Sequence, residues 1–338
     1  YTSINIPYGS MASVLSADSD DRAALSTYRS VGATLAGLII GVGGPMLVYT
    51  TDAAGNQLVH GPRFTLIAGI FSLGAIGCYL LCYFMTTERV KIAPTHHEEQ
   101  VSFKETVKAL VSNRALLGII AAAILLLLAS LMTQSVNQYV FVDYFKNKEA
   151  LAVMSIAGIL PTLLMAPLAV PITRKYGKKE VGAIGCIIGG IASLLLFVLQ
   201  VKSAAVYIAI SVIGYFGFGF FNLIIWAFIT DIIDDQEVRT GKREDGTIYA
   251  VYSFARKIGQ ALSGGLGAYA LALVGYDSSV QVQTAEVAGG GIYNVATLVP
   301  GILYIGVGLC LIFIYPLNKK KVEGNIAILK ERREVNYE

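Results

Sequence analysis

The chain has 338 residues and a net charge of +3; 55% of its residues are hydrophobic, 14% are charged, and its mean hydropathy is +0.62. A soluble domain carries about 25% charged residues, so this composition excludes an ordinary soluble fold and indicates an integral membrane protein in contact with a lipid bilayer. The small net charge gives no reason to expect a nucleic-acid partner.

Apolar runs of spanning length recur along the whole chain. A membrane-spanning helix needs about 20 mainly apolar residues. Such runs predict eight complete spans, at 25–51, 63–86, 115–140, 150–173, 180–201, 203–230, 247–275 and 290–316. Residues 1–15 are amphipathic and begin without a methionine, so they predict the end of a further helix that starts upstream. We therefore expect an all-α polytopic membrane protein.

A polar segment at 87–114 separates two groups of predicted helices. It includes an amphipathic stretch whose apolar residues share one helical face, which indicates a helix lying on the membrane surface. These apolar residues are Phe103, Val107, Leu110 and Val111. Six complete spans follow the segment, whereas about two and a half precede it. If the fold is built from two six-helix halves, about three and a half helices are missing upstream of Tyr1.

The basic residues indicate the orientation. Of the 26 Lys and Arg residues, twenty fall on one side of the predicted spans, four fall on the other, and Arg256 and Lys257 lie within a span. Because cytoplasmic loops carry an excess of Lys and Arg, we expect a multi-pass protein of the cell membrane with a cytoplasmic C-terminus. The predicted domains are the rest of the N-terminal half at 1–86, a cytoplasmic middle loop at 87–114, a C-terminal six-helix half at 115–316, and a cytoplasmic tail at 317–338.

Lys257 places a positive charge at membrane depth. It lies eleven residues beyond Gly246, or about 16 Å along a helix, near the centre of a hydrocarbon core about 30 Å thick. Insertion of Lys there costs about 2.5 to 3.5 kcal/mol, so we expect Lys257 to face a polar cavity in a transporter. The alternative is a purely structural ion pair. Arg256 points about 100° away around the helix and receives no role.

Other kinds of site receive no support. The cysteines lie in predicted spans without paired spacing, which disfavours a disulfide framework or a zinc site. The chain has no G-x-x-x-x-G-K-[ST] motif for ATP hydrolysis, and no acid, base and nucleophile set emerges at membrane depth. We expect neither enzyme activity nor a cofactor, so transport would use an ion gradient.

Several motifs, taken together, resemble one family. They are N-I-P-Y-G-S at 5–10, D-D-R-A-A-L-S-T-Y-R at 20–29, and D-x-x-D, T-G-x-R-x-[DE]-G-x-x-Y and F-x-x-K-x-G-x-x-x-S-G between 231 and 264. They resemble the glycoside-pentoside-hexuronide:cation symporter family, which includes the melibiose carrier and belongs to the major facilitator superfamily. The similarity runs from Tyr1 to about Pro316.

The resemblance implies both a fold and an activity. The fold would be the two-half helix bundle of the superfamily, here lacking helices 1–3 and the start of helix 4. The activity would be symport of a sugar, glycoside or hexuronide with Na⁺ or H⁺ by alternating access. A non-transporting sugar sensor and a lipid-type carrier on the same fold are the alternatives.

The resemblance also implies binding residues. Arg29 corresponds to a sugar-binding arginine, and its guanidinium can hold two hydroxyls or a carboxylate; the alternative is that it snorkels to the interface. Lys257 corresponds to a lysine close to the sugar and cation sites. The acidic residues that hold the coupling ion in the family lie upstream of Tyr1. The candidate substrate-binding residues are Arg29, Lys257, Asn5, Tyr1, Asn222 and Trp226, and the candidate cation-site residues are Thr2 and Asn5.

Helix periodicity places some of these residues together. Tyr1, Asn5 and Gly9 share one helical face, and the positions of Asn5 and Gly9 resemble an aspartate and a tryptophan of the melibiose carrier that are not kept here. Asn222 and Trp226 are also four residues apart on one face. Trp226 could contact a sugar ring, or it could anchor its helix at the membrane interface.

Charged residues at the predicted cytoplasmic helix ends suggest a gate. Opposite charges there could pair when the inner side is closed and separate when it opens. By resemblance they match the family's cytoplasmic gate, although Asp235 stands where the family usually has tyrosine; the alternative is a solvated charged loop. The candidate gate residues are Asp231, Asp234, Arg243, Arg22 and Arg174.

Overall fold

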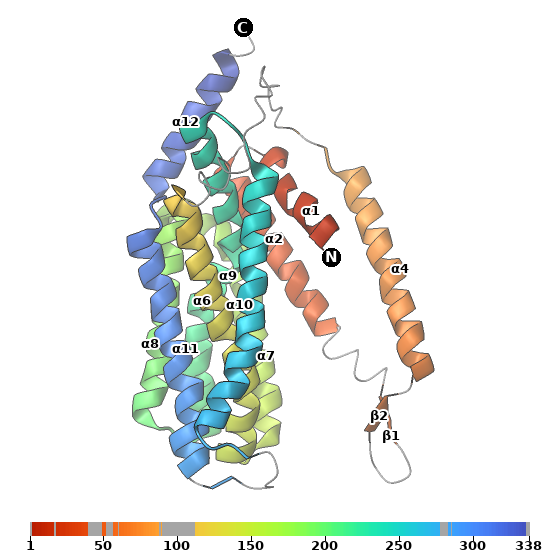
Figure 1. Cartoon of the computed structure of the whole chain (residues 1–338), viewed down its shortest axis with the longest axis vertical. Coiled ribbons are helices and arrows are strands. Elements are labelled where there is room, and N and C mark those ends of the chain that lie inside the picture. The colour runs from red at the N-terminus through yellow and green to blue at the C-terminus, as the bar shows by residue number, and fades with distance from the viewer. Residues whose placement is uncertain are drawn as a thin grey trace.

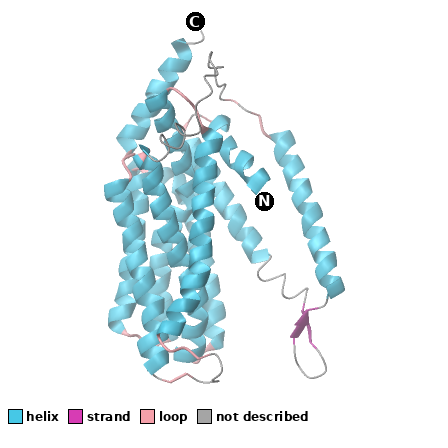
Figure 2. Ribbon diagram, viewed as in Figure 1, coloured by secondary structure: helices cyan, strands magenta, loops and turns pink. Residues whose placement is uncertain are grey.

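The computed structural model describes residues 2–16, 18–39, 49–51, 57–59, 61–87, 89, 112–277, 283–284 and 286–335. Within these ranges the chain is helical apart from one short strand pair (Figures 1 and 2). Strand β1 (Tyr49–Thr51) runs antiparallel to β2 (Gln57–Val59). Tyr1 and the predicted surface helix of the middle loop lie outside the described residues, so the predictions made for them stay predictions.

The helices follow one another in chain order. They are α1 (Thr2–Leu15), α2 (Ser19–Leu38), α4 (Gly61–Met85), α6 (Arg114–Tyr139), α7 (Lys148–Tyr176), α8 (Lys178–Leu199), α9 (Ala204–Thr240), α10 (Asp245–Leu273), α11 (Asn294–Leu309) and α12 (Lys319–Val335). Three π-helical segments adjoin them: η2 (Val140–Tyr144), η3 (Glu286–Tyr293) and η4 (Cys310–Ile314).

Six helices in the described ranges are long and apolar enough to cross a membrane. They cover Gly61–Met85, Arg114–Tyr144, Val153–Tyr176, Lys178–Leu199, Ala204–Thr240 and Glu286–Ile314. The other two predicted spans correspond to α10 and α2. Helix α10 forms where the sequence predicts it, but it is not among these six long, apolar helices. The prediction of a helix over 25–51 is wrong at its end, because α2 ends at Leu38 and 49–51 forms β1.

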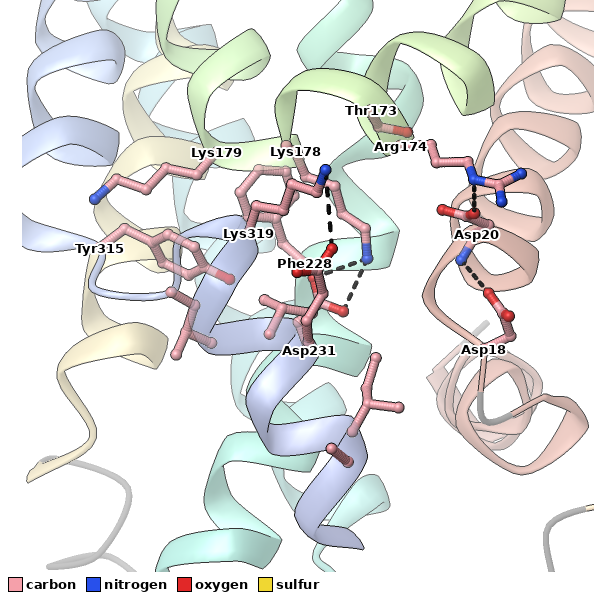
Figure 3. A pocket seen from close by; sticks show the side chains of 16 residues that line it. Asp18, Asp20, Thr173, Arg174, Lys178, Lys179, Phe228, Asp231, Tyr315 and Lys319 are labelled. Carbon is pink, nitrogen blue, oxygen red and sulfur yellow. Dashed lines mark hydrogen bonds and ion pairs between the residues drawn. The ribbon is translucent and has the colours of Figure 1, made fainter. Parts of the chain in front are cut away.

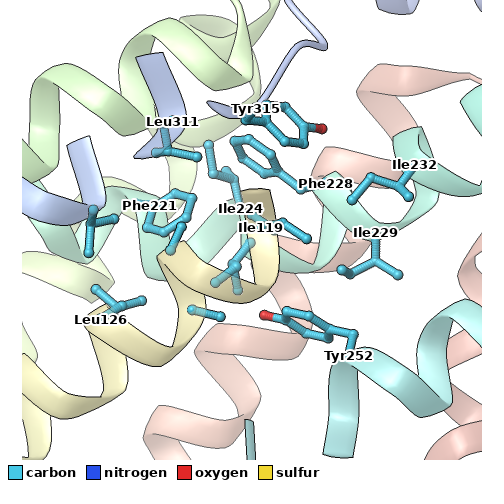
Figure 4. Close-up of a cluster of buried hydrophobic side chains, with 14 of the residues drawn as sticks. Ile119, Leu126, Phe221, Ile224, Phe228, Ile229, Ile232, Tyr252, Leu311 and Tyr315 are labelled. Atoms are coloured by element: carbon cyan, nitrogen blue, oxygen red, sulfur yellow. The ribbon is translucent and has the colours of Figure 1, made fainter. Parts of the chain in front are cut away.

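Helix α9 organises the packing. With 37 residues it is the longest helix described, and it packs against α2, α7, α8 and α12. Its Phe221, Ile224 and Phe228 belong to one buried cluster with Ile119 of α6 and Tyr252 of α10 (Figure 4). Lipid tails are as apolar as these side chains, so in a membrane such a cluster is stabilised by close packing more than by the hydrophobic effect.

Two glycines let α8 and α9 approach closely. A methyl group on Gly185 would overlap the backbone oxygen of Gly217, and a methyl group on Gly217 would overlap the backbone oxygen of Gly185. Backbone atoms inside two packed helices cannot move aside as a flexible side chain can. Small residues are therefore required at this crossing, as is usual where membrane helices touch.

Gly185→Ala is expected to destabilise the bundle by about 1–3 kcal/mol, the usual cost of overpacking. The better helix propensity of alanine offsets at most about 1 kcal/mol of that cost. Thermal unfolding in detergent measures the effect, and Gly264→Ala is the matched control, since no atom lies within 4 Å of a methyl group there. Equal melting temperatures for the two variants would contradict the close α8–α9 contact.

Helices α4 and α12 differ most from the rest of the bundle. Helix α4 stands apart from it (Figure 1), and none of its residues is buried, so this apolar helix requires lipid or further protein around it. Residues 319–335, expected only as part of a tail, form helix α12 packed on α9, with Asn325 and Leu329 buried. Helix α12 thus adds contacts to the C-terminal end of α9, which carries several acidic residues and is called its charged end below.

Candidate functional site

An arginine lies on an aromatic cluster where α2, α9 and α10 meet. The aromatic cluster consists of Trp226 from α9 and Tyr249 and Tyr252 from α10. The Tyr249 ring stacks on the indole of Trp226 with centroids 5.5 Å apart, and the Tyr252 ring meets it edge-on at 5.6 Å. The guanidinium carbon of Arg29 lies 3.8 Å from the centre of the Trp226 ring, a close cation–π contact.

Hydrogen bonds between α2 and α9 hold Arg29 in this position. Ser26 Oγ donates to the Leu223 carbonyl at 2.7 Å, and Ser30 Oγ lies 3.1 Å from the same oxygen and 3.3 Å from the Asn222 carbonyl. Ser26 and Ser30 are four residues apart, so they lie on one face of α2 against α9. Arg29 lies beside that face of α2, and its side chain reaches the indole of Trp226, one turn further along α9.

The structure places the two adjacent cations of α10 differently. Arg256 is half-buried: its guanidinium carbon lies 4.9 Å from the centre of the Trp226 ring, and Nη1 donates to the Tyr252 hydroxyl at 3.4 Å. Lys257 is exposed, and its Nζ donates to Gln260 Oε1 at 3.1 Å. The sequence assigned a role to Lys257 and none to Arg256. The spacing of Tyr249, Tyr252 and Arg256, at i, i+3 and i+7, was the signal that could have identified Arg256.

Gly9 accounts for the packing of α1 on the aromatic cluster. A methyl group on Gly9 would overlap the ring of Tyr249, which is only 2% exposed. The missing side chain therefore leaves room for Tyr249 to stack on Trp226. Thr2 and Asn5 belong to the same helix, but their side chains lie outside the described residues, so their assignments stay predictions. Asn222 is exposed.

A narrow cavity extends from the aromatic cluster toward the charged end of α9. It measures about 70 Å³, and its lining includes Tyr8, Gly9, Arg22, Arg29 and Trp226. Pockets for small organic ligands have volumes of roughly 300–1,000 Å³, so this cavity must widen to admit a sugar. One end of it meets the aromatic cluster and the other meets a buried ionic network.

That network centres on Asp234 of α9. Arg22 Nη1 lies 2.5 Å from Asp234 Oδ2, and Arg243 Nη1 lies 3.2 Å from Oδ1 of the same carboxylate. Arg243 also pairs with Glu237 at 2.5 Å and with Asp245 at 2.9 Å. We call these five residues the Asp234 network. It brings together three of the five predicted gate residues, whereas Glu237 and Asp245 were not predicted.

The two arginines of the network are strongly held. Arg22 is 1% exposed, so its guanidinium depends on its protein contacts for a counter-charge. Burial lowers the pKa of Arg243, but the carboxylates of Asp245, Asp234 and Glu237 outweigh burial and raise the pKa overall. Asp234 is the carboxylate that both guanidinium groups share.

The other two predicted gate residues form separate pairs (Figure 3). Asp231 accepts from Lys178 Nζ at 2.8 Å through each of its oxygens, and this pair is nearly buried. Arg174 Nε lies 3.3 Å from Asp20 Oδ2, with both side chains exposed. These pairs border a second cavity of about 440 Å³ that α12 also lines. Lys178 was not among the predicted gate residues.

Helix α12 attaches to the acidic residues that follow Asp234. Asn325 Nδ2 donates to Asp235 Oδ1 at 3.1 Å, and Lys321 lies 3.6 Å from the same oxygen. Arg333 lies 3.3 Å from Glu237 Oε2, the oxygen that also pairs with Arg243. Asp235, which stands where the resembled family usually has tyrosine, thus serves as an attachment point for α12. Glu237 connects α12 to the Asp234 network.

Long apolar helices around a half-buried arginine–aromatic cluster, with a network of ion pairs at one end, define a multi-pass membrane protein of the transporter class. The chain belongs to the glycoside-pentoside-hexuronide:cation symporter family, because residues 1–319 match the family described as MFS/sugar transport protein. This confirms the resemblance found in the sequence motifs.

Curated relatives agree with this membership. The chain is 30% identical to the uncharacterized symporter YjmB of Bacillus subtilis (strain 168), over 95% of this chain and 68% of that protein. It is 28% identical to a glucuronide carrier protein homolog of Escherichia coli (strain K12), over 100% of this chain and 72% of that protein. It is also 27% identical to the putative glycoside/cation symporter YagG of the same organism, over 96% and 68%.

Proposed function

We propose that the protein is a secondary active symporter that couples uptake of a sugar or glycoside to a Na⁺ or H⁺ gradient. The observation that supports this best is the Arg29 guanidinium, held on Trp226 beside a cavity that leads to a buried ionic network. The family and the name of the relative YagG support a coupling cation. Binding of the sugar and of the cation then favour each other reciprocally.

Arg29 is the proposed centre of sugar binding. Its guanidinium can donate two parallel hydrogen bonds to neighbouring hydroxyls of a sugar ring. The indole that holds Arg29 is covered by it in this state, so Trp226 acts first by positioning the guanidinium and contacts the sugar ring only if Arg29 moves. Asn5, Tyr1, Asn222 and Lys257 complete the proposed substrate site, and Thr2 and Asn5 are the proposed residues of the cation site.

The ion pairs at the charged end are the proposed gate on the cytoplasmic side. Alternating access requires contacts that form when one end of the cavity is closed and break when it opens. The pair of Asp234 with Arg22 joins α9 to α2, which belong to different proposed halves, as such a gate needs. The pair of Asp231 with Lys178 joins α9 to α8 within the proposed 115–316 half, so it holds Asp231 in place beside the gate. The pair of Arg174 with Asp20 joins α7 to α2 but is exposed, so it contributes less.

Uptake by proteoliposomes tests the proposal. Labelled glycosides should accumulate when a Na⁺ or pH gradient is imposed and should not accumulate when the gradient is collapsed. Saturable binding without accumulation would support the non-transporting sensor instead. Protection of Lys257 from chemical modification by phospholipid, and not by sugar, would support a lipid-type carrier.

Arg29→Lys is expected to lower uptake by about 10- to 100-fold. Lysine keeps the positive charge but loses the planar fork that donates two hydrogen bonds at once, and a hydrogen bond to a charged group contributes about 1.5–3 kcal/mol. Initial uptake rates at low substrate concentration measure the loss. Lys330→Arg, on α12 and far along the chain from the site, is the control for protein insertion and amount. Unchanged uptake by Arg29→Lys would remove Arg29 from the proposed site.

A further inference from the structure

Two cations from different helices meet at the end of η4. Arg114 is the first residue of α6 and Lys179 is the second residue of α8, and both helices pack against η4. Arg114 donates through Nε to the Ile314 carbonyl at 3.1 Å and through Nη2 to the Phe313 carbonyl at 2.6 Å. Lys179 Nζ donates to the Ile312 carbonyl at 3.1 Å. Because these three carbonyls are consecutive at one helix end, the two positive groups lie close together.

Neither cation is neutralised by an ion pair in the described part of the chain. The partners of Arg114 and Lys179 there are carbonyl oxygens. Glu180, the next residue in α8, attracts Lys179 without pairing with it. An ammonium group has three N–H donors and a guanidinium has five, so each cation keeps donors that the carbonyls do not use. Both groups can therefore bind a negatively charged partner.

The neighbouring Lys178 is used differently. Figure 3 shows Lys178 pointing toward Asp231, whereas Lys179 points away from that carboxylate. Lys178 is nearly buried and bonds both oxygens of Asp231. Arg114, by contrast, is exposed. Lys178 thus belongs to an internal ion pair, and Lys179 joins Arg114 at the surface.

Arg114 and Lys179 lie where hydrocarbon is expected to give way to lipid headgroups. Just inside this boundary, Leu117 is 42% exposed and Phe313 is 67% exposed. In a membrane, lipid tails as apolar as leucine surround such side chains. The surface therefore presents two positive groups next to apolar side chains. Three of the candidate membrane spans start or finish at this level, namely Arg114–Tyr144, Lys178–Leu199 and Glu286–Ile314.

An anionic phospholipid has a matching arrangement of groups. Its phosphate carries a negative charge and accepts charge-assisted hydrogen bonds, and its acyl chains begin a few bonds away. Guanidinium and ammonium groups both bind phosphate, and a guanidinium can donate two parallel bonds to it. Basic pockets between membrane helices suit such headgroups. A free phosphate would use the two cations but would leave the apolar surface beside them uncovered.

We propose that Arg114 and Lys179 bind the phosphate of an anionic phospholipid whose acyl chains lie along Leu117 and Phe313. The lipid connects the ends of α6, α8 and η4 from the outside of the bundle. The site shares no residue with the aromatic cluster or with the Asp234 network, so the proposal does not depend on which substrate is transported.

Lipid titrations of the full chain in detergent test the proposal. Thermal unfolding is followed as phosphatidylglycerol or phosphatidylcholine with the same acyl chains is added, and native mass spectrometry counts the bound lipids. We expect phosphatidylglycerol to bind about tenfold or more tightly, because it alone of the two carries a net negative charge for the two cations. Glycerol 3-phosphate, which offers the phosphate without acyl chains, should raise the melting temperature much less at the same concentration.

The double variant Arg114→Gln, Lys179→Gln is expected to weaken phosphatidylglycerol binding by about 10- to 30-fold and to change phosphatidylcholine binding by less than about threefold, as loss of two cations at a membrane surface predicts. Glutamine keeps an amide that can donate to the η4 carbonyls, so the helix end stays capped. The pair Arg114→Lys, Lys179→Arg keeps both charges and should retain the preference for phosphatidylglycerol.

Lys202→Gln is the matched control. It also removes one exposed lysine, but at the other end of α8, whose 22 residues separate it from Lys179 by about 33 Å. That distance exceeds the screening length of about 8–10 Å, so phosphatidylglycerol binding should change by less than about threefold.

The wild type alone decides part of the question. Equal affinity for the two lipids would contradict the proposal, even if the double variant failed to fold. A preference for phosphatidylglycerol that survives in the double variant would mean that the two cations only cap the end of η4. A rise in melting temperature with glycerol 3-phosphate as large as that with phosphatidylglycerol would make this a site for a soluble phosphate and overturn the assignment to a lipid.

Discussion

Asp234→Asn is expected to lower the free energy of unfolding by about 3–5 kcal/mol, the range measured when one partner of a buried ion pair is removed. Asparagine has nearly the same shape as aspartate, so the packing of α9 is unchanged and the loss is electrostatic. The carboxylate is shared by Arg22 and Arg243, at 2.5 and 3.2 Å, and Arg22 is almost fully buried. Both guanidinium groups would lose a counter-charge at once.

Asp20→Asn is the matched control for this effect. It makes the same chemical change at the same end of the bundle, but its partner Arg174 is 78% exposed and its own side chain is 37% exposed. Exposed ion pairs contribute about 0–1 kcal/mol, so Asp20→Asn should unfold close to the wild type. Thermal and denaturant unfolding in detergent compare the two variants. If both variants lose the same stability, the Asp234 network does not contribute the stability expected of a buried ion pair.

Three of the five members of the Asp234 network could be named from the sequence, because charge near helix ends is rare in a membrane chain. Arg22, Asp234 and Arg243 stand out individually, and pairing opposite charges across helices requires no coordinates. The sequence could not assign the partners of Asp231 and Arg174. Which residues pair depends on the orientation of each helix about its own axis, which the sequence does not give. Lys178, for example, reaches Asp231 from the first residue of α8.

The two cations of α10 show a different limit. Residue position can be counted along a helix, so the sequence alone draws attention to the charged pair in the middle of α10. The direction in which each side chain points depends on which face of α10 packs against α9. Tyr249 and Tyr252 pack on Trp226 and carry Arg256 with them, whereas the adjacent Lys257 points about 100° away and is exposed. Position along the helix alone therefore does not tell which of two adjacent residues faces the aromatic cluster.

The prediction of a helix over 25–51 is wrong at its end for a related reason. The apolar run is continuous in composition, yet Tyr49–Thr51 pairs with Gln57–Val59 as β1 and β2, and composition alone does not reveal such a pairing. In the same way, the polar residues at 319–335 predicted a tail because their contacts, Asp235 and Glu237, are almost a hundred residues away. Long-range pairing of this kind decides whether a polar segment folds onto the protein.

Gly9→Leu is expected to cost about 1–3 kcal/mol of stability and to lower sugar affinity by tenfold or more. Any Cβ at this position overlaps the ring of Tyr249, which is buried and stacked on Trp226, so the ring must leave the stack. Because Arg29 lies on the same indole, displacement of Tyr249 disturbs the guanidinium that we propose binds the sugar. A substitution on α1 thus acts on the site through one aromatic ring.

A second substitution tests whether Gly9 acts on the site through Tyr249. Tyr249→Ala in the Gly9→Leu background removes the ring that the leucine would strike, so the double variant should be more stable than the sum of the two single effects predicts. Gly32→Leu on α2 is the control, since no atom lies within 4 Å of a methyl group there. Melting temperatures and glycoside affinities of the four proteins in the cycle give the coupling. Strictly additive effects would mean that Gly9 does not act through Tyr249, and that the contact between α1 and the aromatic cluster does not set the position of Arg29.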